Sequence, residues 1–262
     1  MATTAGGSID DRIRQRQTAG RNPLETIPTT NNPRANIPNT PLASATIAFS
    51  LGSVFAIGAL TFLLGGFPNT PWLTYQLGFF LAAWALFHWA EFAVTAGWNL
   101  EKCSVDSYLL DNGAMYHVAN SAALLEYLIV WYFRPSSKSF PHVTPIGIVL
   151  VIAGQALRST AMIHASTNFS HSVAFHKRDT HQLVTNGIYG WFRHPSYAGF
   201  FYWALGTQLV LQNVFTFVLF AVLLWRFFYY RTRAEEAALI RFFGDDYVKY
   251  RKQVGTKIPF VP

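Results

Sequence analysis

The sequence predicts an all-α, polytopic membrane protein with about six transmembrane helices, the last two forming a short helical hairpin. Hydrophobic residues make up 51% of the 262 residues and charged residues only 13%, against about 25% charged in an ordinary soluble domain. No Asp, Glu, Lys or Arg occurs from residue 35 to residue 90. The single cysteine, Cys103, cannot form an internal disulfide, which excludes a small disulfide-rich secreted fold.

Four apolar segments are long enough to cross a bilayer, since a helix needs about 20 residues to span a hydrocarbon core of about 30 Å. They lie at 43–66, 72–96, 114–133 and 143–165. Two prolines within 67–71 predict a turn between the first two spans. These helices would form a four-helix membrane region over 41–165.

The apolar run from Gly199 to Arg231 predicts the helical hairpin. As one helix it would be about 50 Å long, too long for a single crossing. The polar pair Gln212-Asn213 near its middle favours two shorter helices. A polar segment before this hairpin and a C-terminal helix after it would complete a second region over 166–262.

The basic residues lie mostly on one predicted side of the membrane. With six spans, both chain ends and the 166–197 segment share a side and carry 15 of the 20 Lys and Arg residues. The positive-inside rule makes that side cytosolic, which accounts for the net charge of +7 without nucleic acid. Residues 1–40 have no apolar run, so we expect a disordered cytosolic tail and no signal peptide.

Three charged residues stand out within the predicted spans, and each is a functional candidate because burial of charge in a membrane is costly. Glu91 is interpreted as a helix-end residue near the headgroups, and Glu126 as the partner of a basic residue on a neighbouring helix. Arg158 is too deep to reach the headgroups easily. It either pairs with Glu126 or lines a cavity and binds an anion.

The 166–197 segment carries four histidines but predicts no metal site. His171, His176, His181 and His194 are spaced by 5, 5 and 13 residues, which fits no standard zinc motif. Pro195 favours a helix that begins there with His194 as its cap, and the free N–H groups of such a terminus can bind an anion. An ordinary helix start at the membrane surface remains the alternative.

A further polar group follows the last span. Arg231 and Glu235 are four residues apart and share one helix face. This segment is either a basic juxtamembrane helix that contacts anionic lipid or part of a ligand site. The adjacent acids Glu235 and Glu236 favour the ligand site.

Taken together, these motifs resemble the isoprenylcysteine carboxyl methyltransferase family, densely over about 154–262. The residues that carry the resemblance are Arg193-His194-Pro195-Ser196-Tyr197, Gly187-x-Tyr189, Asp179-x-His181-x-Leu183-Val184, Arg231-x-x-x-Glu235-Glu236 and Phe243-Gly244-x-x-Tyr247. The resemblance implies an endoplasmic-reticulum enzyme that methylates the C-terminal prenylcysteine carboxylate of processed CaaX proteins, carrying farnesyl or geranylgeranyl groups. The methyl donor would be S-adenosylmethionine, with no metal.

The resemblance also implies that 166–262 is the catalytic region, and it implies roles for individual residues. The donor would be bound by His181, Gln182, Leu183, Val184, Tyr189, His194, Pro195, Ser196, Tyr197 and Glu235. Gln182 lies where the family varies, so we expect it to contribute its backbone. Arg231 would face the junction between donor and acceptor.

The chemistry of such a reaction fits these residues. A C-terminal carboxylate has a pKa near 3.5 and is ionised at neutral pH, so its methylation needs no general base. It needs alignment of the two reactants and exclusion of water. We expect Arg158 and Arg231 to hold the carboxylate, because arginine can bind it through two parallel hydrogen bonds.

Other functions are compatible with parts of the pattern. A membrane sterol reductase that uses NADPH has a similar His-Pro-x-Tyr element. A phospholipid N-methyltransferase would share the donor but act on an amine. A small transporter or membrane scaffold would show internal symmetry, and no internal repeat is visible in the sequence.

Overall fold

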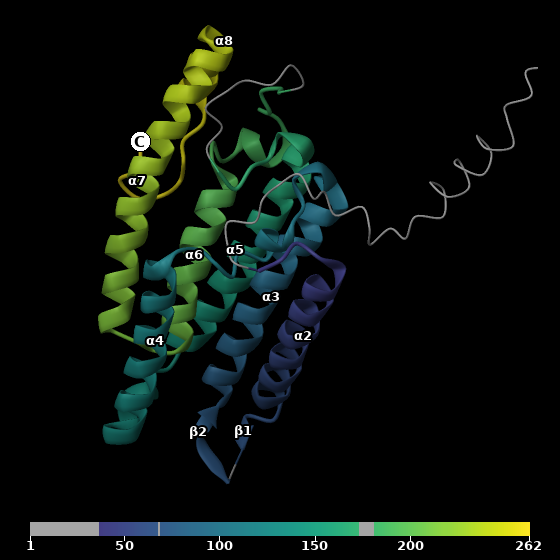
Figure 1. The fold of residues 1–262 in the computed structure, drawn as a ribbon. Helices are drawn as coiled ribbons and strands as arrows, with labels where there is room; N and C mark the ends of the chain where they lie inside the picture. The colour runs from purple at the N-terminus through teal and green to yellow at the C-terminus, as the bar shows by residue number, and fades with distance from the viewer. Residues whose placement is uncertain (1–36, 68, 173–180) are drawn as a thin grey trace, which may run out of the picture.

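A computed structural model of the protein describes residues 37–67, 69–172 and 181–262. The tail predicted for 1–40 thus lies almost wholly outside the described residues. The α-helices are α2 (Pro41–Leu63), α3 (Tyr75–Trp98), α4 (Ala114–Phe133), α5 (Val143–Ala165), α6 (Pro195–Val210), α7 (Phe215–Phe243) and α8 (Asp245–Gln253). Short 3-10 turns are η2 (Leu100–Lys102), η3 (Val105–Tyr108), η4 (Pro135–Lys138), η5 (Ser166–Asn168) and η6 (Gly187–Gly190). In Figure 1 the long helices stand side by side, with α8 at one end of the bundle.

The predominantly helical fold is confirmed, and α4 and α5 coincide with the predicted spans 114–133 and 143–165. Thr40 and Thr74 start α2 and α3 by accepting a backbone N–H from the first turn. The turn predicted over 67–71 belongs to a small antiparallel pair, β1 (Gly66–Phe67) and β2 (Thr70–Thr74), at the end of the bundle opposite α8 (Figure 1). This pair is the departure from a purely helical fold within the described residues.

The helical hairpin is asymmetric. Its first helix, α6, is short, whereas α7 continues for 29 residues and includes most of the predicted C-terminal helix. The chain breaks only at Gly244, whose φ of +55° favours glycine. In the described part of the chain, the helices with the length and hydropathy of a membrane span are α2, α3, α5 with its extension to Asn168, and α7. The six crossings therefore stay a prediction.

The turn between α6 and α7 is held by two charged groups. The Glu126 carboxylate accepts the backbone N–H groups of Val214, Phe215 and Thr216 at 2.8, 2.9 and 2.6 Å, where a helix N-terminus favours negative charge. The expected ion pair between Glu126 and a basic residue was therefore wrong, because the start of α7 satisfies its oxygens. Lys138 donates to the carbonyls of Leu211 and Gln212 from the other side.

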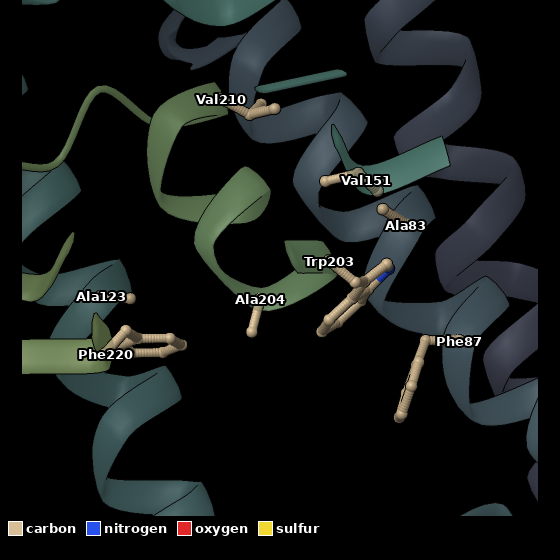
Figure 2. Close-up of a cluster of buried hydrophobic side chains, with 8 residues drawn as sticks. All are labelled: Ala83, Phe87, Ala123, Val151, Trp203, Ala204, Val210 and Phe220. Carbon is tan, nitrogen blue, oxygen red and sulfur yellow. The ribbon is translucent and has the colours of Figure 1, made fainter. Parts of the chain in front are cut away.

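Glycines bring α5 and α6 into direct backbone contact. A Cβ added at Gly154 would lie 2.6 Å from the Gly199 carbonyl oxygen, and one added at Gly147 would lie 2.8 Å from the Gly206 carbonyl oxygen. Next to this contact, Phe87, Val151, Trp203 and their neighbours form the buried hydrophobic cluster shown in Figure 2. The α5–α6 pair is thus a rigid support for side chains at its α8 end.

Candidate active site

A cavity of about 1420 Å³ lies between α3, α4, α5, α6, α7 and the segments 99–113 and 169–172. One part of its wall is polar and is formed by Arg158, His171, Ser196, Tyr197 and Arg231. Another part is apolar and includes Phe200, Trp203, Ala204, Phe220, Leu224 and Phe227. The cavity can therefore accept a molecule with a charged or polar head and an apolar tail.

Arg158 is buried within the bundle, with 8% of its surface exposed, and forms an ion pair with Glu91 of α3. Its Nε donates to Glu91 Oε1, and its Nη2 donates to Glu91 Oε2 at 2.8 Å. Its Nη1 donates to Ser196 Oγ at 3.1 Å. The expected helix-end position of Glu91 was wrong, since α3 continues beyond it to Trp98 and Glu91 is buried. The alternative pairing of Arg158 with Glu126 was also wrong, and Arg158 lines the cavity instead.

His171 covers the outer side of this ion pair. Its Nδ1 lies 3.6 Å from Glu91 Oε2, and its Nε2 lies 3.5 Å from Thr95 Oγ1. Burial lowers the pKa of His171 to about 4, because desolvation disfavours the charged imidazolium. The ring is therefore neutral near pH 7, so the negative charge of Glu91 is balanced by Arg158.

Tyr197 joins the two residues of α7 that the sequence placed on one helix face. Its hydroxyl donates to Glu235 Oε2 and accepts a hydrogen bond from Arg231 Nε at 2.9 Å. Arg231 also donates to the carbonyl oxygen of His171. The guanidinium of Arg231 is thus oriented from two sides at the cavity wall. Arg231 and Glu235 lie together, as their spacing predicted.

The start of α6 is fixed by a second buried ion pair. His194 and Pro195 begin the helix as predicted, but the His194 side chain makes no capping hydrogen bond. Its Nε2 lies 3.3 Å from Glu236 Oε1, and its ring stacks on Tyr197 with centroids 5.3 Å apart. Arg193 donates to the same Glu236 oxygen at 2.5 Å. Because the side chain is engaged by Glu236, the predicted cap role of His194 is limited to its backbone.

The other residues predicted for donor binding lie beside the end of α7 and near α8. The His181 ring is 5.6 Å from the Phe243 ring, and the Tyr189 carbonyl accepts the Tyr250 hydroxyl at 2.6 Å. Gln182 donates its backbone N–H to Asn168 Oδ1 at 2.9 Å. Leu183 and Val184 are half-buried. The motif residue Asp179 and the histidine at 176 lie outside the described residues.

Of the predicted site residues, Arg158, Ser196, Tyr197 and Arg231 line the cavity. Glu235 and His194 adjoin it through Tyr197, whereas 181–184 and Tyr189 do not line it. Sequence reasoning missed the Glu91–Arg158 and Arg193–Glu236 pairs. The signal for the first was a Glu and an Arg deep in two apolar helices. Among the described residues, no three His, Cys, Asp or Glu side chains form a group that could hold a metal.

The helical membrane fold and this half-polar, half-apolar cavity define the class as a membrane-embedded enzyme with an amphiphilic substrate. Residues 147–241 match the model of the isoprenylcysteine carboxyl methyltransferase (ICMT) family. A Homo sapiens protein-S-isoprenylcysteine O-methyltransferase is 42% identical over 211 residues, covering 80% of this chain and 72% of its own length. The Saccharomyces cerevisiae protein of the same name is 41% identical over 233 residues, covering 86% and 95%.

A solved structure, the eukaryotic intramembrane Ras methyltransferase ICMT, is also similar. It matches 98% of this chain and 88% of its own chain with a TM-score of 0.79 and 33% identity. The chain belongs to the isoprenylcysteine carboxyl methyltransferase family and is an enzyme of that kind. The resemblance drawn from its motifs is thus confirmed. The reductase, phospholipid methyltransferase and transporter alternatives are set aside.

Proposed function

We propose that the family's methyl transfer takes place in this chain at the polar wall of the cavity, with S-adenosylmethionine as donor. The acceptor is the carboxylate of a farnesylated or geranylgeranylated C-terminal cysteine. The observation that carries the proposal is the cavity itself, which combines Arg158 and Arg231 on its polar wall with an apolar wall. The prenyl chain would occupy the apolar part and the carboxylate the part beside Arg231.

The assignment of the acceptor site follows from the different surroundings of Arg158 and Arg231. The Arg158 charge is balanced by Glu91, and its Nη1 faces Ser196. Arg231 has no carboxylate within ion-pair distance among the described residues, and its hydrogen bonds go to Tyr197 and the His171 carbonyl. Arg231 therefore carries a positive charge that no direct ion pair balances, and it binds the carboxylate. Arg158 and Ser196 orient the second oxygen.

The donor side is formed by His181, Gln182, Leu183, Val184, Tyr189, His194, Pro195, Ser196, Tyr197 and Glu235. Glu235 fits this role because its side chain is 29% exposed and is held in place by Tyr197. A carboxylate so placed can accept hydrogen bonds from ligand hydroxyls. The donor supplies a methyl group on a positively charged sulfur. Because the Tyr197 hydroxyl contacts both Glu235 and Arg231, the donor site lies next to Arg231.

The reaction needs placement rather than acid–base catalysis. A bond forms between a carboxylate oxygen and the methyl carbon while the sulfur–methyl bond breaks, and no proton moves. Because the carboxylate is ionised at neutral pH, the protein's part is to align the two groups and exclude water. The neutral His171 and the Phe169 ring beside it serve the exclusion of water.

The enzyme is proposed to act at the cytosolic face of the endoplasmic-reticulum membrane, with both termini cytosolic. Supporting this orientation, the α8 end of the bundle carries exposed Lys249, Arg251 and Lys252, and basic residues favour the cytosolic side. The Tyr197–Arg231 contact lies toward the same end. A soluble donor and a membrane-borne acceptor could both reach a site at this depth.

The test is methyl transfer in membranes that contain the protein, using donor labelled in its methyl group. A farnesylated cysteine should become a labelled methyl ester, and Arg231→Gln should reduce the rate by more than about tenfold. Phospholipid without prenylcysteine should remain unlabelled, and NADPH should not bind. Labelling of phospholipid, or no labelling of farnesylated cysteine, would contradict the proposal.

A further inference from the structure

A third arginine lines the cavity and has no part in the chemistry described above. Arg226 lies on α7, is exposed, and belongs to the same cavity wall as Arg231. Among the described residues no carboxylate lies within ion-pair distance of it. Its guanidinium carbon lies over the Tyr230 ring, 5.3 Å from the ring centroid. Arg226 therefore keeps its guanidinium donors available.

The position of Arg226 along α7 makes this exposure unusual. It precedes Arg231 by five residues, about 7.5 Å along the helix axis, on the side away from α8. The residues before it, 215–225, contain no charge. An exposed arginine at the depth of an apolar helix is costly, so such a residue is a functional candidate by default.

Arg226 also lies in the part of the bundle where the cavity lies between α4 and α7. Toward the α6–α7 turn, α4 and α7 are joined by Ala123 with Phe220 and by Glu126 with the start of α7. Closer to α8, the first turns of α4 line the cavity through Met115, Tyr116, Ala119 and Asn120. The cavity thus separates these turns of α4 from the part of α7 that carries Arg226.

We propose that Arg226 is an entrance site that binds the carboxylate of the incoming prenylcysteine before it reaches Arg231. This inference rests on the proposed function, because it assumes an anionic, lipid-borne acceptor. Such a molecule must move its charge past apolar side chains, and a first arginine on that path lowers the cost of the transfer. Arg226 acts in capture of the acceptor and does not touch the reacting methyl group.

The test is the steady-state kinetics of Arg226→Gln with farnesylated cysteine. The KM for the acceptor should rise about fivefold to tenfold, with kcat and the KM for the donor unchanged within about twofold. Arg226→Lys should recover most of the loss, because it restores the charge. The matched control is Arg233→Gln, since Arg233 is also exposed on α7 beside a tyrosine ring but does not line the cavity. An unchanged acceptor KM in Arg226→Gln, or an equal rise in Arg233→Gln, would overturn the proposal.

Two further measurements separate capture of the acceptor from a contact with lipid phosphate. The methyl ester of N-acetylated farnesylcysteine has no charge, because its amine is acylated and its carboxylate is esterified, so its inhibition constant should be the same in wild type and Arg226→Gln. The rise in acceptor KM should persist in a detergent without phospholipid. A rise seen only in vesicles that contain phosphatidylglycerol would assign Arg226 to lipid phosphate and overturn the entrance role. A wild type that methylates no prenylcysteine would instead contradict the proposed function itself.

Discussion

The two interfaces that α6 and α7 make with the earlier helices are built in opposite ways. Between α5 and α6, pairs of glycines seven residues apart on each helix bring the backbones into contact. Between α4 and α7, the helices touch near the α6–α7 turn and are separated by the cavity nearer α8. One interface is closed along its length and the other is open over part of it.

This difference shows which interface fixes the positions of side chains and which one leaves space for a ligand. The closed pair holds Arg158 against Ser196, because Gly199 allows α6 to approach the Arg158 backbone. The open pair presents apolar and aromatic side chains to a ligand. A membrane enzyme for a lipid-linked acid needs both properties, a rigid wall for the reacting groups and a lateral space for the lipid.

The largest effect is expected from adding one methyl group to the closed interface. In Gly154→Ala the new Cβ would lie 2.6 Å from the Gly199 oxygen and 2.7 Å from the Trp203 nitrogen. Both atoms belong to the backbone, so we expect a loss of about 2–3 kcal/mol of stability. Thermal unfolding in detergent measures it. The control, Gly52→Ala, has no atom within 4 Å of the new Cβ and should be neutral or stabilise α2 by up to about 1 kcal/mol. Equal stability of both variants would show that close packing of α5 on α6 is unimportant.

The next effect concerns the buried ion pair on the closed side. Arg158→Ala should reduce methyl transfer by more than about tenfold and should also destabilise the protein, because Glu91 is left as a buried unpaired charge. The double variant Arg158→Met, Glu91→Gln removes both charges. It should regain stability but not activity when thermal unfolding and methyl transfer are compared. Activity near wild type in the folded double variant would remove Arg158 from the acceptor site.

A loss of activity that saturating donor should recover is expected from Glu235. Glu235→Ala should reduce methyl transfer by more than about tenfold at low donor concentration. Most of that loss should be a higher KM for S-adenosylmethionine. Glu101→Ala, which removes an exposed acid of η2, is the matched control. If saturating donor fails to recover the rate of Glu235→Ala, the residue does not act in donor binding.

The smallest effect is the dependence on pH. The pKa of His171 is lowered from 6.5 to about 4 in the folded protein. As the pH falls, the His171 ring is therefore protonated in the unfolded chain before it is protonated in the folded one. Its contribution to stability is therefore complete above pH 6.5 and is lost as the pH falls toward 4. Thermal unfolding between pH 7 and pH 5 should show a loss of stability in the wild type that is smaller in His171→Gln.

Between pH 6.5 and 8, the rate of methyl transfer should vary by less than about twofold. A rate that rises steeply over this range would point to a catalytic base.

The sequence predicted local features of the fold and site well, because they depend on neighbours along the chain. The bounds of α4 and α5 follow from apolar runs, and the Arg231–Glu235 face follows from helical periodicity. The partner of Arg158 could not be predicted, because Glu91 is 67 residues away and depends on how α3 packs on α5. The role of Glu126 was missed for the same reason.

Two further features depend on tertiary structure rather than on periodicity. The length of α7 was underestimated because its polar end was interpreted as a separate helix, yet no residue breaks the helix before Gly244. The open side between α4 and α7 has no local signature, since lipid-facing and cavity-facing apolar residues look alike in sequence.

The central claim is that the lipid part of the acceptor occupies the space between α4, α6 and α7 while its carboxylate lies at Arg231. Photo-crosslinking tests it most directly, using a prenylcysteine with a photoreactive group at the far end of the prenyl chain and mass spectrometry to locate the adduct. We predict labelling of cavity residues such as Ala119, Ala204 and Leu224, suppressed by excess farnesylated cysteine. Competable labelling confined to the lipid-facing residues of α2, such as Phe49 and Ile57, would contradict the account.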